Sequence, residues 1–224
     1  MKKIVIANCN EILNSAQTEL QEKYKAIGIQ NKEDLNLEDL NLIKPDYIFF
    51  MHWSWIIPES IYNRFNCVVF HMTDLPFGRG GSPLQNLIIR GYKETKISAL
   101  KVDGGIDTGD IYLKKELSLE GTAAEIFTRT GKIIKNMIEE IINNPITPTK
   151  QIGEVTSFKR RKPEQSLIDN SINSIEGIYN FIRMLDADNY PHAFLETDVF
   201  KFEFTEAKIN NSKELTAHVR IIKK

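Results

Sequence analysis

The chain has 224 residues, enough for one domain or for a large domain with a smaller one. Hydrophobic residues make up 42% and charged residues 26%, which is typical of a globular protein. The net charge of −1 gives no overall positive field, so it argues against a general nucleic-acid binder while leaving room for a local basic patch. No apolar run approaches the length of a membrane span and the N-terminus lacks the pattern of a signal peptide, so we expect a cytoplasmic protein without a membrane partner.

The two cysteines, Cys9 and Cys67, both lie in apolar, strand-like runs. This placement predicts buried free thiols in a reducing compartment rather than a disulfide or a metal-binding pair. The four histidines are scattered along the chain without the spacing of metal ligands, so no metal is expected.

The first third of the chain alternates short apolar runs with helix-like segments. Strands are predicted at 4–7, 26–29, 46–50 and 67–70, with helices at 12–24 and 59–65 and a loop with a short helix at 35–43. This order predicts an α/β fold with a doubly wound, mostly parallel sheet. Ligands of such sheets bind beyond the carboxyl ends of the strands, where His52 and His71 are expected.

The rest of the chain extends this pattern and then departs from it. A helix is predicted at 83–90, a long hairpin at 95–102 and 111–119 that adds an antiparallel edge, and a helix at 122–144 with a capping box of Thr122 and Glu125. Pro145 and Pro148 then interrupt the pattern, so we place a boundary near residue 150. It divides a core at 1–150 from a small subdomain at 151–224, which has a helix at 174–185 and strands at 199–204 and 215–221.

Two loops rich in glycine follow predicted strands. The first, LPFGRGGSP at 75–83, begins four residues after His71. The second, GGIDTGD at 104–110, contains Asp107. Because both loops belong to the end of the sheet where ligands bind, we expect His71 and Asp107 to meet. From the pattern alone, such a histidine is more often structural than catalytic, and Asp107 suits a turn.

These two segments carry a resemblance. HMTDLPFGRGGSP at 71–83 resembles the pattern H-P-S-x-L-P-x-x-R-G-x-x-P of the folate-dependent formyltransferases, and GGIDTGDI at 104–111 resembles the second signature of that family at the matching spacing. The segments 158–166 and 190–194 resemble regions after the core in the sugar-nucleotide and methionyl-tRNA branches. The resemblance implies a Rossmann-like core, and it is closest to sugar N-formyltransferases such as those of pseudaminic acid-type pathways.

The resemblance implies a reaction and a set of site residues. A formyl group passes from 10-formyltetrahydrofolate, the expected co-substrate, to the amine of a nucleotide-linked amino sugar. His71 is the general base or the partner of the oxyanion, and Asp107 positions it. The folate slot is expected at Trp53, Ser54, Trp55, Ile56, Ile57, Gly104, Gly105 and Ile106. The acceptor is expected at Thr73, Arg79, Gly80, Gly81 and Gln85.

Several alternatives stay open at this point. The two tryptophans either line a flat pocket or plug the edge of the core. Arg79 either binds phosphates or braces its loop, and the basic run Lys159–Lys162 is either a solvated turn or a diphosphate site.

One position departs from the family pattern. The family has an asparagine two residues before the histidine, where its amide bonds the formyl oxygen, and this chain has Val69. Either Gln85, Asn86 or His52 replaces that donor, or His71 and backbone N–H groups hold the oxyanion, or catalysis is impaired.

The rival functions follow from these features. One is a formyltransferase or hydrolase that acts on another acceptor, an aminoacyl-tRNA or water. Another is a catalytically impaired protein that binds folate or nucleotide. The short segment after residue 150 and the net charge argue against tRNA, so we expect a small-molecule substrate and no nucleic acid. The β-rich end at 198–222 allows a homodimer.

Overall fold

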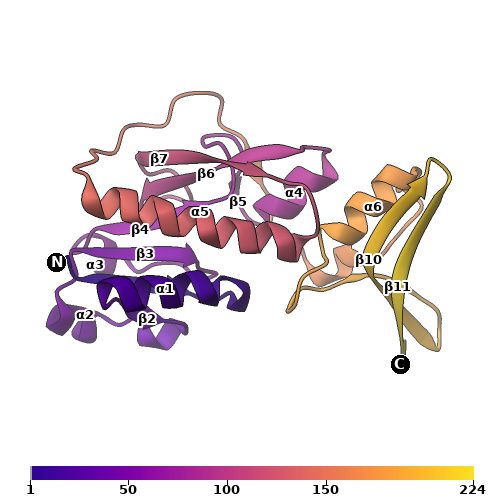
Figure 1. The fold of residues 1–224 in the computed structure, drawn as a ribbon, viewed down its shortest axis with the longest axis horizontal. Coiled ribbons are helices and arrows are strands. Elements are labelled where there is room, and N and C mark those ends of the chain that lie inside the picture. Colours follow the sequence, from indigo (N-terminus) through magenta and orange to yellow (C-terminus); the bar gives the residue numbers. More distant parts are fainter. Residues whose placement is uncertain (1) are drawn as a thin grey trace. The chain divides into compact units, whose positions relative to one another are not determined.

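The structure is a computed structural model that describes residues 2–224 (Figure 1). Contacts between residues group the chain into two compact units. Unit 1 comprises the described residues up to Gly80, Thr95–Leu117 and Phe127–Ser157, and unit 2 comprises Gly81–Glu94, Ser118–Ile126 and Phe158–Lys224. The predicted division into a folate-binding core and a small subdomain at residue 150 stays a prediction.

Unit 1 is built on a six-stranded sheet with the order β2-β1-β3-β4-β6-β7. Its strands are β1 (Ile4–Asn8), β2 (Ile27–Ile29), β3 (Tyr47–His52), β4 (Cys67–His71), β6 (Glu94–Lys101) and β7 (Ile111–Ser118). β1 pairs in parallel with β2 and β3, β3 pairs in parallel with β4, and β4 pairs antiparallel with β6. The predicted mostly parallel sheet with an antiparallel edge is therefore confirmed.

Helices flank this sheet (Figure 1). They are α1 (Asn14–Tyr24), α2 (Leu37–Ile43), α3 (Glu59–Tyr62) and α5 (Ala123–Asn143), with short 3-10 helices at Glu11–Leu13 and Lys32–Asp34. Thr122 and Glu125 form the predicted capping box at the start of α5: the Glu125 carboxylate accepts from the Thr122 N–H at 2.8 Å, and the Thr122 hydroxyl accepts from the Glu125 N–H at 3.3 Å. α3 ends three residues earlier than predicted.

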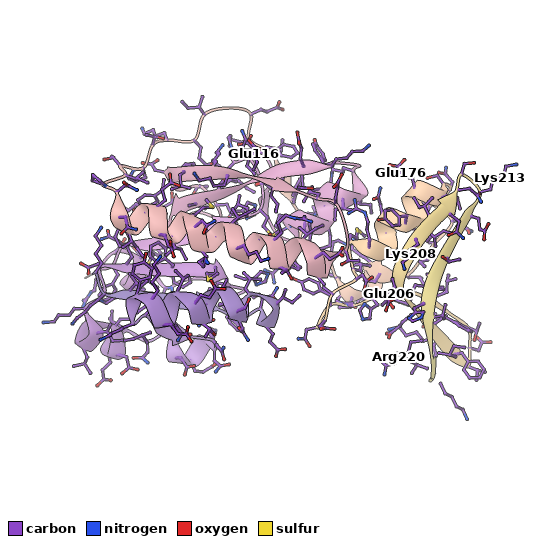
Figure 2. The ribbon with its side chains drawn as sticks, in the orientation of Figure 1. Glu116, Glu176, Glu206, Lys208, Lys213 and Arg220 are labelled. Carbon is purple, nitrogen blue, oxygen red and sulfur yellow. The ribbon has the colours of Figure 1, made fainter. Side chains whose placement is uncertain are left out.

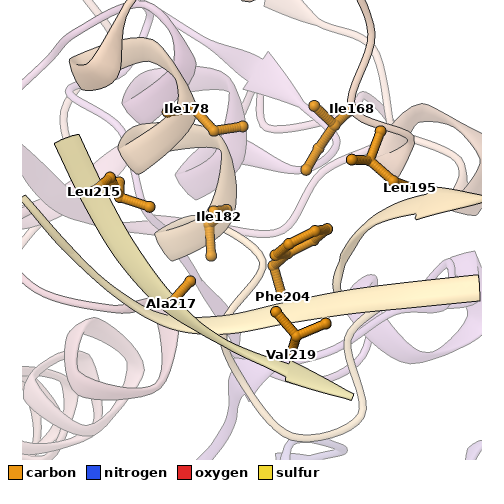
Figure 3. A pocket seen from close by; sticks show the side chains of 8 residues that line it. All are labelled: Ile168, Ile178, Ile182, Leu195, Phe204, Leu215, Ala217 and Val219. Carbon is orange, nitrogen blue, oxygen red and sulfur yellow. The ribbon is translucent and has the colours of Figure 1, made fainter. Parts of the chain in front are cut away.

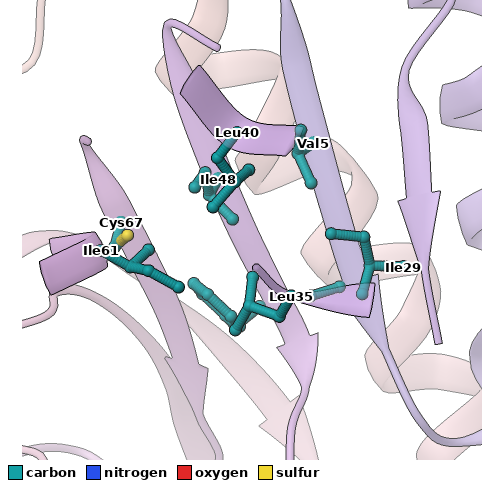
Figure 4. Close-up of a cluster of buried hydrophobic side chains, with 9 residues drawn as sticks. Val5, Ile29, Leu35, Leu40, Ile48, Ile61 and Cys67 are labelled. Carbon is teal, nitrogen blue, oxygen red and sulfur yellow. The ribbon is translucent and has the colours of Figure 1, made fainter. Parts of the chain in front are cut away.

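The core explains why the strands read as unbroken apolar runs. All five residues of β1 are buried, as expected of a parallel strand that is covered on both faces. One buried cluster joins side chains of the strands to those of α2 and α3 (Figure 4); it comprises Val5, Ala7, Ile29, Leu35, Leu40, Ile48, Phe50, Ile61 and Cys67.

Cys67 gives a test of this core. Its side chain is 1% exposed, and burial raises the pKa of the thiol to about 12. The thiolate is the reactive form, so Cys67 stays inert at pH 8 in the folded protein, whereas the partly exposed Cys9 reacts. We expect Ellman's reagent to modify one thiol rapidly at pH 8, and the second only after urea unfolds the chain. Equal rates for both thiols would contradict the buried position of Cys67.

Unit 2 contains α4 (Pro83–Ile89), α6 (Ile175–Arg183) and a three-stranded antiparallel sheet with the order β11-β10-β9. The strands are β9 (Ala193–Glu196), β10 (Phe200–Asn211) and β11 (Glu214–Lys223), and a 3-10 helix spans Pro163–Ser166. β10 and β11 extend further than the predicted strands, and β9 was not predicted. Charged side chains project from this hairpin, among them Glu206, Lys208, Lys213 and Arg220 (Figure 2).

A cavity of about 240 Å³ lies in unit 2, between α6 and the three-stranded sheet (Figure 3). Its lining residues are Ile168, Ile178, Ile182, Leu195, Phe204, Leu215, Ala217 and Val219. All eight side chains are apolar, so this cavity offers no group for acid–base chemistry. Within residues 2–224, no helix has the length and apolar character needed to cross a membrane.

Candidate active site

His71 and Asp107 lie close together, as predicted. His71 is the last residue of β4 and is 7% exposed. Its Nδ1 lies 3.5 Å from the Oδ2 of Asp107. Asp107 comes from the loop between β6 and β7, so a strand end and a distant loop contribute one residue each.

The backbone of Asp107 holds its carboxylate in place. Asp107 has a φ of +54°, in the left-handed region that aspartate tolerates better than most residues. The same Oδ2 accepts a hydrogen bond from the Gly80 N–H at 2.8 Å. The carboxylate therefore joins the glycine-rich loop after β4 to the imidazole of His71.

The other ring nitrogen of His71 is also engaged. Nε2 lies 2.8 Å from the carbonyl oxygen of Gly78, which only accepts, so Nε2 carries the proton in this contact. A ring protonated on both nitrogens satisfies Gly78 and Asp107 together, whereas a ring protonated on Nε2 alone presents a lone pair to the carboxylate. Both ring nitrogens therefore have a partner, and the two contacts fix the orientation of the ring.

The loop that supplies Gly78 is fixed from several directions. Thr73 is fully buried, and its hydroxyl donates to the Gly78 oxygen at 3.4 Å. The Gly78 N–H donates to the Thr156 hydroxyl at 2.7 Å, and the Arg79 N–H donates to the Thr156 carbonyl at 3.0 Å. The latter contact belongs to the ladder of β5 (Arg79–Gly80) with β8 (Ser157–Phe158). The predicted role of Thr73 in acceptor binding stays a prediction, since here it bonds its own loop.

Arg79 braces its loop through another side chain. Its Nε and Nη2 donate to the Oε1 of Gln151 at 3.2 and 2.8 Å. No sequence pattern pointed to Gln151 or to Thr156, because they lie 72 and 78 residues beyond the groups they bond. Gly81 and Gln85 belong to unit 2. The predicted roles of Gly80, Gly81 and Gln85 in acceptor binding stay predictions.

The predicted folate slot combines buried and open surface. Trp53 packs against the core cluster and meets the rings of Phe50 at 5.7 Å and Trp55 at 4.9 Å. Trp55 is 39% exposed, Ser54 and Ile56 are exposed, and Ile57 packs on the core cluster. The Nε1 of Trp53 is buried and has no hydrogen-bond partner within residues 2–224. The unpaired Nε1–H of Trp53 beside the partly exposed ring of Trp55 would suit a flat ligand that carries hydrogen-bond acceptors.

The second wall of that predicted slot is an exposed loop. Gly104 and Gly105 are exposed, and Ile106 is 71% exposed. A Cβ built on Gly105 would collide with the side chain of Thr108, so a larger residue there would require Thr108 to move. A Cβ built on Gly104 would lie 3.6 Å from the hydroxyl of Tyr62 in α3, the helix that follows the tryptophan segment. The loop therefore lies close to the helix after Trp53–Ile57, and its binding of folate stays a prediction.

The residues proposed to replace the missing amide donor have other partners. Val69 is partly buried against the core. The Nε2 of Gln85 donates to the Met184 carbonyl at 3.3 Å, and the Nδ2 of Asn86 is within bonding distance of three carbonyls, of which the nearest is Ser82 at 2.9 Å. The two hydrogens of the Asn86 amide are therefore taken up by neighbouring backbone carbonyls. The Nδ1 of His52 lies 3.8 Å from the Cys9 sulfur. The donor to the formyl oxygen therefore stays a prediction.

A basic loop in unit 2 is held in a fixed shape. Asn86 bonds the carbonyl of Lys159 at 3.2 Å, and the Ser82 hydroxyl accepts from the Arg161 N–H at 3.0 Å. The guanidinium of Arg161 lies 5.7 Å from the centre of the Phe181 ring, and burial lowers its pKa without removing its charge. None of the four cations at 159–162 has an ion-pair partner in the described chain.

Residues 2–224 contain no group of three or more His, Cys, Asp or Glu side chains that could hold an ion. The groups near His71 that can take part in acid–base chemistry are its imidazole and the carboxylate of Asp107.

Comparison with known proteins matches both halves of the chain. Residues 6–140 match the family described as formyl transferase, and residues 163–222 match the methionyl-tRNA formyltransferase C-terminal domain. A methionyl-tRNA formyltransferase of Clostridium perfringens is 30% identical over 199 residues, which is 85% of this chain and 63% of that protein. The chain thus spans about three fifths of the length of such curated relatives. A solved structure, the methionyl-tRNA formyltransferase from Clostridium thermocellum, is 50% identical with a TM-score of 0.96, and each chain covers 100% of the other.

These findings correct the expected acceptor. A likely sugar N-formyltransferase from Mycobacterium tuberculosis is 19% identical with a TM-score of 0.71, covering 88% of this chain and 93% of that one, which shows a shared fold alone. The predictions of a nucleotide-sugar substrate, of carbohydrate biosynthesis and of no nucleic-acid partner are wrong. They relied on the short segment after residue 150, although a relative of the same length carries the methionyl-tRNA name. They also relied on net charge, which averages the unpaired basic loop with acidic residues elsewhere.

Proposed function

The chain belongs to the formyl transferase family, and on that premise we propose that it transfers a formyl group from 10-formyltetrahydrofolate to the α-amine of methionyl-tRNA. The observation that carries this proposal is the 50% identity over the full length of the Clostridium thermocellum methionyl-tRNA formyltransferase. The matched C-terminal domain at 163–222 supports the same acceptor.

The residues at the end of the sheet suit this reaction. The folate donor supplies the formyl group and a nitrogen leaving group. The attacking amine must lose a proton, and the leaving nitrogen must gain one, so a group that accepts and returns a proton near neutral pH is required. His71 is that group in this proposal, since imidazole changes its charge in this range. Asp107, 3.5 Å away, orients the ring and stabilises it when protonated.

Negative charge develops on the formyl oxygen as the amine attacks, and it needs a donor. Val69 supplies none, and the amides of Gln85 and Asn86 are bonded elsewhere. The proposed donor is the Nε2–H of His71 that forms during the attack: with its Nδ1–H facing Asp107, the ring takes the amine proton at Nε2, and the same proton then passes to the leaving folate nitrogen. In the structure Nε2 lies 2.8 Å from the Gly78 carbonyl, so binding of the substrates replaces that contact.

The basic loop at 159–162 is the proposed contact for the phosphodiester backbone of the tRNA. Its lysines and arginines lack carboxylate partners in the described chain, so their charge is available to a polyanion. The bonds from Ser82 and Asn86 hold its backbone in one shape, which lowers the entropy lost on binding.

Removing two of these charges tests the contact. We expect Lys159→Ala with Arg160→Ala to raise the KM for methionyl-tRNA about tenfold at low salt, while kcat changes less than about twofold, because phosphate contacts position the substrate without taking part in the chemistry. The dependence of log KM on log salt should become shallower by about two, one for each lost contact. Steady-state kinetics between 50 and 200 mM salt measure both effects.

A matched control removes the same charge elsewhere. Lys208 and Lys213 are exposed on the β10–β11 hairpin (Figure 2), and their double alanine variant should keep the wild-type KM and salt slope. Equal losses in the two variants would mean that overall charge, and not the basic loop, governs tRNA binding.

The function itself is tested by an acceptor assay. Purified protein is incubated with 10-formyltetrahydrofolate and methionyl-tRNA, and the amino acid released by mild base is weighed by mass spectrometry. The proposal expects methionine to gain one formyl group in step with release of tetrahydrofolate. Folate binding without transfer to methionyl-tRNA or to water would favour the impaired binding protein that Val69 suggested.

A further inference from the structure

Gln151 lies in the segment between α5 and β8, and its amide makes four hydrogen bonds. The Oε1 atom accepts from Arg79 Nε at 3.2 Å and from Arg79 Nη2 at 2.8 Å. The Nε2 atom donates to the carbonyl of Asp107 at 2.8 Å and to the carbonyl of Gly109 at 2.9 Å. Both hydrogens and both lone pairs of the amide are therefore used.

The partners fix the orientation of this amide. Guanidinium nitrogens only donate and backbone carbonyls only accept, so the oxygen must face Arg79 and the nitrogen must face the loop of Asp107. Glutamate at this position would keep the contact with Arg79 but turn a second oxygen toward two carbonyls. Methionine would keep most of the volume and lose all four bonds. Few side chains therefore satisfy both loops.

The segment carrying Gln151 is itself anchored. Two residues earlier, Thr149 exchanges two backbone hydrogen bonds with Ile111 at the start of β7, at 2.7 and 2.9 Å. Gln151 thus projects from a strand-paired position rather than from a free end. This gives its amide a defined base from which to hold two loops.

Bonds from Gln151 to Arg79 and to Asp107 close a ring with the bond between Gly80 and Asp107. Arg79 is followed by Gly80, whose N–H bonds the Asp107 carboxylate at 2.8 Å. The carbonyl of the same Asp107 bonds Gln151, which bonds Arg79 in turn. Gly80 and Asp107 lie in different loops, 27 residues apart in the sequence. The stretch before Asp107 is exposed and rich in glycine. Without the Gln151 amide, the carbonyl of Asp107, whose backbone is left-handed, loses its hydrogen bond, and only the carboxylate keeps its bond to Gly80.

We propose that Gln151 is a positioning residue for formyl transfer: by bridging Arg79 to the carbonyls of Asp107 and Gly109, it holds the Asp107 carboxylate at His71. This inference rests on the proposed function for its kinetic consequence and on geometry alone for its structural one. Gln151 does not touch the reacting atoms, so its loss changes the placement of the pair and leaves substrate affinity intact. A displacement of the order of 1 Å at such a pair typically lowers the rate about a hundredfold.

The test compares Gln151→Glu with Gln30→Glu, the same substitution at an exposed residue far from both loops in sequence. We expect Gln151→Glu to lower kcat about ten- to a hundredfold, with the KM for each substrate within about threefold of wild type. The ring 15N and 1H signals of His71, assigned with His71→Ala, should move in Gln151→Glu and keep their wild-type positions in Gln30→Glu. Gln151→Met is measured in parallel, and it decides the matter if Gln151→Glu does not fold.

Each outcome has a defined reading. Lower kcat with displaced His71 signals supports the positioning role. Wild-type kcat with unchanged His71 signals in a folded Gln151 variant overturns it, as does a loss confined to KM. If the wild-type protein formylates no acceptor, the proposed function fails, and the NMR comparison still decides whether Gln151 holds the pair.

Discussion

Replacing His71 by alanine is expected to lower kcat for formyl transfer by about a hundred- to ten-thousand-fold, the range for loss of a positioned acid–base group. The imidazole is the proposed proton carrier and the proposed donor to the formyl oxygen, so one substitution removes both contributions. The KM for methionyl-tRNA should change little, because binding relies on other surfaces. Single-turnover kinetics with saturating donor measure the chemical step directly.

His218 supplies the control for this variant. Its side chain on β11 is 78% exposed, and its Nδ1 lies 3.4 Å from Oε1 of Glu206. It is therefore a surface histidine, unlike the buried His71. His218→Ala should keep wild-type turnover. A folded His71→Ala protein that retains turnover within about threefold of wild type would remove His71 from the mechanism.

Asp107→Asn is the second variant with a large expected effect. Asparagine keeps the shape, accepts the Gly80 N–H as the carboxylate does, and tolerates the left-handed backbone at a φ of +54°. What it loses is the negative charge facing Nδ1 of His71 at 3.5 Å. We expect kcat to fall by about a hundred- to ten-thousand-fold, as when the orienting carboxylate of a catalytic histidine is neutralised.

Two measurements separate this loss from a folding defect. Asp110→Asn makes the same change three residues away in the same loop and should leave kcat unchanged. The thermal midpoint of Asp107→Asn should stay close to that of Asp110→Asn. If both variants lose activity together, the loop rather than the charge at Asp107 is responsible.

Much of unit 1 was predictable because its central strands β1 and β4 are largely buried. β1 is apolar along its whole length, and runs of this kind stand out between polar helices. The meeting of His71 and Asp107 was predicted from the rule that ligands bind at the carboxyl ends of parallel strands, but the structure reaches it by another route. β6 runs antiparallel to β4, so the loop after β6 begins beside Cys67 at the start of β4, and Asp107 reaches His71 from within that loop.

The contacts that support the pair were not predictable in the same way. Gln151 and Thr156 bond loops more than 70 residues earlier in the chain, and neither belongs to a motif. β9 was missed because it forms only through pairing with β10, where Phe202 lies opposite Leu195. The β10–β11 hairpin was underestimated because charged residues such as Lys201 and Glu203 alternate with its apolar side chains and blur the ends.

The acceptor was misjudged for a physical reason. Net charge is a sum over the whole chain, whereas a polyanion contacts one surface. The cations at 159–162 are the proposed surface, and a total charge of −1 conceals them. Knowing which cations lack an ion-pair partner therefore helps to predict nucleic-acid binding, whereas net charge alone does not.

The most direct test of the account compares two acceptors that carry the same amine. Formyl transfer from 10-formyltetrahydrofolate is measured for methionyl-tRNA and for methionine methyl ester, which lacks the nucleic acid. We predict a kcat/KM for methionyl-tRNA at least about a hundredfold higher at low salt, because phosphate contacts supply affinity that the ester cannot gain. Equal values, or transfer to the ester alone, would contradict the proposal that this protein acts on aminoacyl-tRNA.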